Sequence, residues 1–127
     1  MYELTKIDYM KVSNLINNLN GGYIFAYAVL ENIQSGHIYV DNINNPNCCL
    51  IVSNGGKYLV AGDEENLNFR DILSLFLKNP NNHSNYFDLY VSSEKWLKII
   101  SGLLEDHVVK LGRSIYCYLV LLLLIVV

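Results

Sequence analysis

Three polar residues fall at positions where the side chains of a small domain often line a cleft. Tyr39 lies on a predicted strand and Asp41 ends it, while Glu31 lies at the end of a predicted helix, where a carboxylate opposes the helix dipole. These residues are candidates for a substrate cleft whose partner is a small amine or another protein. Two simpler roles stay open: Asp41 as a turn former that bonds the Asn-rich backbone after it, and Glu31 as an exposed helix end.

The histidines and cysteines show no spacing that is typical of a metal or catalytic centre. The histidines are His37, His83 and His107, and no two of them stand at i, i+2 or i, i+4, so the sequence predicts no metal site. Cys48 and Cys49 are adjacent on a predicted strand, without a neighbouring cation or helix N-terminus to lower a thiol pKa. We therefore expect both cysteines to be small, buried apolar residues.

Composition and charge exclude several classes of protein. The chain has 127 residues, of which 52% are hydrophobic and 17% charged, the opposite of the balance that keeps a chain disordered. Nine Lys and Arg against twelve Asp and Glu give a net charge of −3, which leaves no basic surplus for nucleic acid. Three cysteines without a paired framework, and a start without an apolar signal segment, favour a cytoplasmic protein. We expect one folded domain with no nucleic-acid partner.

The first half of the chain predicts two helices followed by a three-stranded meander. An apolar repeat with helical spacing follows Asp8, a residue that can cap a helix. Asn54-Gly55-Gly56 is typical of a tight hairpin, because Asn and Gly tolerate positive φ. The predicted helices cover Tyr9–Asn20 and Tyr23 to about Ile33, and the predicted strands cover His37–Asp41, Cys48–Ser53 and Lys57–Gly62.

The second half predicts alternating helices and strands. Asn66 opens one helix and Ser93 can cap the next, and each precedes an apolar stripe with helical spacing. Trp96 falls on the second stripe, so we expect it in the core. The remaining predicted elements are a strand over Tyr86–Val91 and a last strand over residues 107–118. The order αα-βββ-α-β-α-β predicts an α/β (α+β) fold, with a mixed, mostly antiparallel sheet flanked by helices.

Two groups of residues, in this order along the chain, resemble a known family. The first group is Ala28-Val29-Leu30-Glu31, Gly36-His37-Ile38-Tyr39-Val40-Asp41, Pro46 and Leu50-Ile51, and the second is Tyr58-Leu59, Gly62, Phe69, Trp96, Arg113 and Tyr116. Together they are similar to the N-terminal lobe of the GNAT superfamily of N-acetyltransferases, in the bacterial branch that includes the zwittermicin-resistance acetyltransferase. The resemblance covers about residues 10–116 and implies a GNAT-like fold.

The resemblance also implies an activity and a cofactor. In the intact family an acetyl group passes from acetyl-CoA to an amine acceptor. The family's cofactor loop carries several glycines before a helix, and its backbone N–H groups hold the CoA pyrophosphate. Here the loop reads Gly62-Asp63-Glu64-Glu65, with one glycine and three carboxylates. At ~4–6 Å and an effective dielectric near 20, each carboxylate would repel a phosphate charge by roughly 3–4 kcal/mol. We therefore expect a degenerate cofactor loop and no acetyl-CoA bound to this chain.

The last residues form an uncharged apolar run. Residues 115–127 are too few for the roughly twenty residues of a membrane span, so we expect no membrane partner. We divide the chain into a GNAT-like lobe, residues 1–118, and an apolar tail, residues 119–127, which we expect to be the product of a truncation or a frameshift. Deleting that tail should leave the lobe folded. A native strand is the alternative interpretation of the same residues.

The sequence thus predicts the N-terminal lobe of a GNAT-type N-acetyltransferase, inactive alone because the acetyl-CoA-binding lobe is absent. Its expected partners are the missing C-terminal lobe or a second copy of the chain. Two other functions stay open: a non-catalytic binding or interaction module, and a small membrane-associated protein that uses the C-terminal run. No catalytic residue follows from the sequence.

Overall fold

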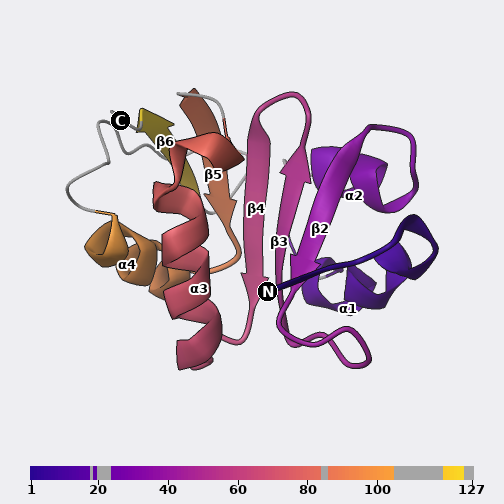
Figure 1. Cartoon of the computed structure of the whole chain (residues 1–127), viewed down its shortest axis with the longest axis horizontal. Helices are drawn as coiled ribbons and strands as arrows, with labels where there is room; N and C mark the ends of the chain where they lie inside the picture. The colour runs from indigo at the N-terminus through magenta and orange to yellow at the C-terminus, as the bar shows by residue number, and fades with distance from the viewer. Residues whose placement is uncertain (18, 20–23, 84–85, 105–118, 125–127) are drawn as a thin grey trace.

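Six strands form one mixed sheet in the part of the chain that the computed structural model describes, residues 1–17, 19, 24–83, 86–104 and 119–124 (Figure 1). The strands lie in chain order, and all neighbours are antiparallel except β4 and β5, which are parallel. This arrangement confirms the predicted fold class. The strands are β1 (Tyr2–Glu3), β2 (Gly36–Val40), β3 (Cys48–Ser53), β4 (Lys57–Gly62), β5 (Tyr86–Val91) and β6 (Leu119–Leu124).

Helices cover both faces of the sheet, because successive residues of a strand point to opposite faces. On β3, Leu50 packs in the cluster with α3 and α4, whereas Ile51 packs in the cluster with α1 and α2. In Figure 1, α3 therefore lies in front of the strands and α1 and α2 lie behind them. The helices are η1 (Lys6–Val12), α1 (Ser13–Ile16), α2 (Ile24–Leu30), α3 (Leu67–Lys78), η2 (Pro80–Asn82) and α4 (Glu94–Leu103), where η marks a 3-10 helix.

The structure confirms the strands, helix caps and hairpin predicted from local sequence signals in the middle of the chain. The bounds of β3, β4 and β5 are those predicted from the sequence. Asn66 caps α3 by accepting a hydrogen bond from Phe69 N at 3.0 Å, and Ser93 caps α4 by accepting one from Trp96 N at 3.1 Å. Trp96 is fully buried, as expected. Gly56 closes the predicted hairpin with φ +82°, a value that favours glycine.

The predicted helix over Tyr9–Asn20 is wrong in its start and its type. The chain instead forms the 3-10 helix η1 and then the four-residue α1, and Asp8 lies inside η1 rather than capping it. Packing against the sheet determines this geometry, because the Tyr9 hydroxyl donates to Gly36 O at 3.2 Å and Val12 is fully buried. The two-residue strand β1 was also not predicted, since it is too short to show a periodic pattern.

The last described residues form the strand β6, which follows the segment where the sequence predicted the last strand. The predicted last strand, residues 107–118, lies outside the described residues. β6 pairs antiparallel with β5 at six positions, from Leu119 with Val91 to Leu124 with Tyr86. Six residues of the predicted tail thus belong to the sheet, which favours the alternative of a native strand, while the division of the chain at residue 118 stays a prediction. None of the described helices is long and apolar enough to cross a membrane.

Candidate functional site

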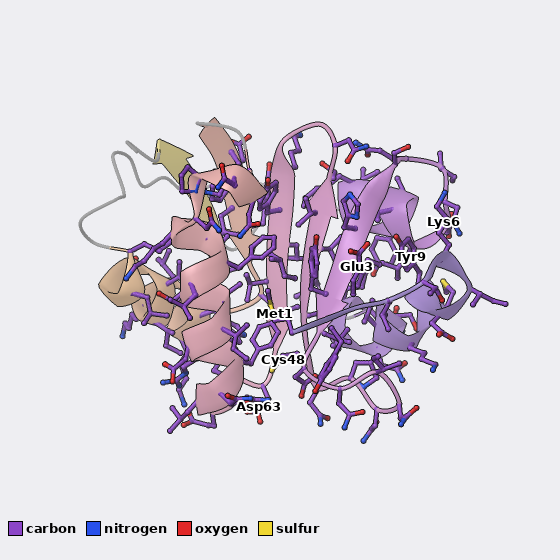
Figure 2. The ribbon with its side chains drawn as sticks, viewed as in Figure 1. Met1, Glu3, Lys6, Tyr9, Cys48 and Asp63 are labelled. Atoms are coloured by element: carbon purple, nitrogen blue, oxygen red, sulfur yellow. The ribbon has the colours of Figure 1, made fainter. Side chains whose placement is uncertain are left out.

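The loop between β4 and α3, residues 62–66, folds against the turn that precedes β3. Asp63 N donates to Asn47 O at 2.8 Å, and Cys48 Sγ donates to Asp63 O at 3.1 Å; Figure 2 shows Cys48 and Asp63 next to each other at this end of the sheet. Gly62 has φ +111°, and a Cβ added to it would lie 2.1 Å from Asn47 O. Gly62 is therefore required by contact with the chain's own backbone, without any ligand.

The chain's own oxygens bind several backbone N–H groups at the start of α3. Glu65 N donates to Asp63 Oδ1 at 3.0 Å, and Asn66 N donates to Asp63 O at 3.4 Å. Phe69 N donates to the side chain of Asn66. A helix N-terminus holds a phosphate through backbone N–H groups of this kind. At Glu65, Asn66 and Phe69 these donors are already bonded to the chain's own oxygens.

The N-terminal end of α4 closes the other side of the loop. Trp96 Nε1 donates to Gly62 O at 3.0 Å, and the Ser93 hydroxyl donates to Glu64 Oε1 at 2.7 Å. The same hydroxyl accepts the capping bond of α4, so Ser93 links the loop to the helix start. Ser92 N also donates to Val60 O at 3.0 Å, which extends the parallel pairing of β4 and β5 beyond the end of β5.

Two basic side chains face the carboxylates of this loop. Lys95 Nζ forms an ion pair with Glu65, and Arg70 lies 3.9 Å from the same carboxylate. Arg70 Nε also donates a hydrogen bond to Glu64 O. These cations are directed at the loop's own oxygens and are not left for a phosphate. The residues of the loop consequently do not fit the diphosphate of CoA.

The cysteines and histidines form no reactive site among the described residues. Burial raises the pKa of Cys48 to about 12 and also raises the pKa of Cys49, so both are neutral buried thiols, as expected. His37 Nδ1 lies 2.8 Å from a Glu3 carboxylate oxygen. In the part of the chain that the structure describes, no three metal-ligating side chains gather, and His107 lies outside that part.

Tyr39 and Asp41 line a groove between α3 and the β1–β2 edge, which we call the α3 groove. It has a polar half of about 450 Å³ and an apolar half of about 330 Å³, which share Met1 and Ile72. In Figure 2, Met1 lies over the middle strands of the sheet, beside α3. The polar half is lined by Asp41, Asn42, Asn47, Asn66 and Asn68, and the apolar half by Tyr39, Leu75 and Phe76.

Asp41 has the turn-forming role that the sequence left open, and it also faces the α3 groove. Its Oδ1 accepts hydrogen bonds from Asn47 N at 2.9 Å and Cys48 N at 3.0 Å. Its Oδ2 accepts one from Asn66 Nδ2 at 3.1 Å, so Asp41 also holds the residue that caps α3. The structure thus connects the groove directly to the β4–α3 loop.

Glu31 does not belong to this groove. It is exposed and follows α2, which packs on the opposite face of the sheet from α3. The structure therefore brings together two of the three predicted cleft residues. It adds Ile72 and Phe76, two residues of the apolar stripe that follows Asn66, which are half-buried walls of the groove.

The fold and the loop define a class of protein: an α/β domain with a parallel β4–β5 pair and a helix that begins at the loop after β4, the arrangement of N-acetyltransferases. The family model described as GNAT acetyltransferase matches residues 14–119, and the chain belongs to this family. The chain is 28% identical over 120 residues to YdfB, an uncharacterized N-acetyltransferase of Bacillus subtilis (strain 168). That match covers 93% of this chain and 45% of the relative, so the chain spans about half the relative's length. The predicted GNAT resemblance is confirmed, and the particular bacterial branch stays a prediction.

Proposed function

We propose that this domain takes part in acetyl transfer from acetyl-CoA to an amine as a lobe that does not itself hold the cofactor. Family membership supports the reaction class, and the relative's name supports an amine acceptor. The proposal that this lobe does not itself hold the cofactor rests on one observation. Trp96 Nε1 donates a hydrogen bond to Gly62 O, which ties the start of α4 to the loop where the family binds CoA.

Opening this loop for a diphosphate would be unfavourable. Trp96 is fully buried, so breaking its bond to the half-buried Gly62 O would leave the buried indole N–H without a partner, at about 1–3 kcal/mol. The bond between Ser93 and Glu64 would also have to break. The released Glu64 carboxylate would then lie near an incoming phosphate and repel it.

In this proposal another GNAT domain holds the acetyl-CoA. A second copy of this chain would bring the same closed loop, so it would not supply a cofactor site. The partner is therefore a GNAT lobe whose loop after β4 is rich in glycine and free of carboxylates. The open alternatives of a pure interaction module and a membrane-associated protein have no comparable support.

A chimera tests the proposal. This chain replaces the matching segment of the Bacillus relative, and release of free CoA thiol from acetyl-CoA is followed with a panel of primary amines. We expect amine-dependent release by the chimera and none by this chain alone. Release by the chain alone would contradict the closed-loop assignment, and an inactive but folded chimera would contradict a role in acetyl transfer.

A further inference from the structure

The hairpin between β3 and β4 carries an Asn-Gly pair in an exposed turn. From the geometry of this turn we infer that Asn54 is a modification site: its side chain deamidates without an enzyme, through a cyclic imide formed with the backbone nitrogen of Gly55. The site lies at the opposite end of β4 from the β4–α3 loop, and it is independent of the proposed function.

The turn is short, and the residues that flank the pair close it. Gly56 N donates to Ser53 O at 3.1 Å, and Lys57 N donates to the Ser53 hydroxyl oxygen at 3.1 Å. Asn54 and Gly55 occupy the central positions between these bonds, and both are exposed. Only Gly56 has a positive φ in this segment, as in a type I turn followed by a left-handed glycine. The turn thus presents the pair to water.

The two reacting groups are not held by the rest of the described chain. The carboxamide of Asn54 forms no hydrogen bond with the described residues, and Gly55 N donates none to them. Gly55 has no Cβ to hinder approach to its nitrogen, and glycine has the backbone freedom that ring closure needs. The backbone N–H of Asn54, in contrast, donates to Ser35 O at 3.0 Å. The side chain can therefore rotate toward Gly55 N while the main chain of Asn54 stays attached.

The reaction needs only water as a co-reactant. Gly55 N loses its proton and attacks Asn54 Cγ; the N–Cγ bond forms, the Cγ–Nδ2 bond breaks, and Nδ2 leaves as ammonia with the released proton. Water then opens the cyclic imide, adding its hydroxyl group to a carbonyl carbon and returning a proton to Gly55 N. Opening at Cγ gives an aspartyl residue at position 54, and opening at the backbone carbonyl carbon gives an isoaspartyl residue.

Other asparagines of the described chain are protected in ways that Asn54 is not. Asn42 and Asn66 use their side-chain oxygens to accept hydrogen bonds from backbone N–H groups. Asn45 and Asn79 precede prolines, whose nitrogens carry no hydrogen to lose. Within the described ranges, Asn54 alone is followed by glycine. Asn54 is therefore the described asparagine that should react first.

The isoaspartyl product changes the turn itself. Its Cβ becomes part of the main chain, so the path from Ser53 to Gly56 grows by a carbon atom. The bond from Gly56 N to Ser53 O then no longer closes a turn of the same size. Both products also add a carboxylate to the exposed hairpin, so the modified chain can be separated from the original by its charge.

The test incubates the full, folded chain at mildly alkaline pH, with a parallel sample in urea. Ion exchange separates the acidic forms, and peptide mass spectrometry maps each modified asparagine. We expect Asn54 to deamidate first in the folded chain, with isoaspartyl and aspartyl products. Gly55→Ala should lose this modification over the same incubation, because a methyl group beside the nitrogen hinders ring closure. This variant should fold, since the atom nearest to the added Cβ, Gln34 Nε2, lies 3.4 Å away.

A second pair of variants assigns the acidic form to this residue. Asn54→Ser removes the carboxamide and should abolish the acidic form. Asn44→Ser is the matched control and should leave it unchanged: Asn44 is exposed, but the next backbone nitrogen, Asn45 N, already donates to Asn42 Oδ1 at 3.1 Å. Deamidation of Asn54 only in urea, an unchanged rate in Gly55→Ala, or earlier reaction of another described asparagine would overturn the inference.

Discussion

Gly62 is the residue on which the contact between the β4–α3 loop and the preceding turn depends. Its φ of +111° disfavours any side chain, and a methyl group in place of its hydrogen would lie 2.1 Å from Asn47 O. Gly62→Ala should therefore lower the free energy of unfolding by about 2 kcal/mol or more, measured by urea denaturation. Gly102→Ala is the matched control: it lies in α4 with open space around its Cβ and should raise stability by about 0.5–1 kcal/mol.

The two adjacent cysteines differ from reactive thiols in burial and in pKa. With a pKa of about 12, roughly one Cys48 in ten thousand is a thiolate at pH 8. We expect iodoacetamide at pH 8 to leave Cys48 and Cys49 unmodified in the folded chain and to modify both in urea, as read by peptide mass spectrometry. Rapid modification of either cysteine without denaturant would show that this part of the sheet opens.

At the scale of elements, one residue links α4 to the β4–α3 loop. Ser93 both caps α4 and donates to Glu64, so Ser93→Ala should lower the free energy of unfolding by about 1–2 kcal/mol. Ser101→Ala, in the interior of the same helix, should change stability by less than about 0.5 kcal/mol. Similar unfolding midpoints for the two variants would argue against the proposed link.

The pairing of β6 with β5 changes what deletion of residues 119–127 should do. The sequence alone favoured a tail that can be removed, whereas the structure pairs all six residues of β5 with this segment. β5 also carries the buried core residues Phe87 and Leu89. We expect the deletion to lower the free energy of unfolding by about 3 kcal/mol or more, through lost strand hydrogen bonds. A deletion variant with an unchanged thermal midpoint would restore the tail interpretation.

Elements with strong local signals could be predicted from the sequence, and those determined by packing could not. Cys48–Ser53 and Lys57–Gly62 are bounded by turn residues on both sides, so their limits are visible in the sequence. The 3-10 geometry of η1 depends on where Tyr9 reaches Gly36, 27 residues away. Such contacts leave no periodic pattern in the chain.

The candidate site shows the same division. Tyr39 and Asp41 could be found because Tyr39 lies near the end of a strand and Asp41 directly follows it, where side chains meet a loop. Glu31 lies outside the groove, which the sequence could not show because it does not say which face of the sheet α2 covers. The bond from Trp96 to Gly62 joins residues 34 positions apart, so the sequence shows the carboxylates of the loop but not the contact that ties the loop to α4.

At the scale of the whole molecule, the proposed function depends on the loop that α4 ties down, which we propose is closed to the cofactor of the family. The most direct measurement is a calorimetric titration of the full chain with acetyl-CoA, repeated by NMR to follow residues 62–66. We predict no saturable binding up to millimolar acetyl-CoA and no shift changes in that loop. Micromolar binding with shift changes centred on Gly62 and Asp63 would contradict the closed loop, because it would show that the loop opens and that this domain holds the cofactor itself.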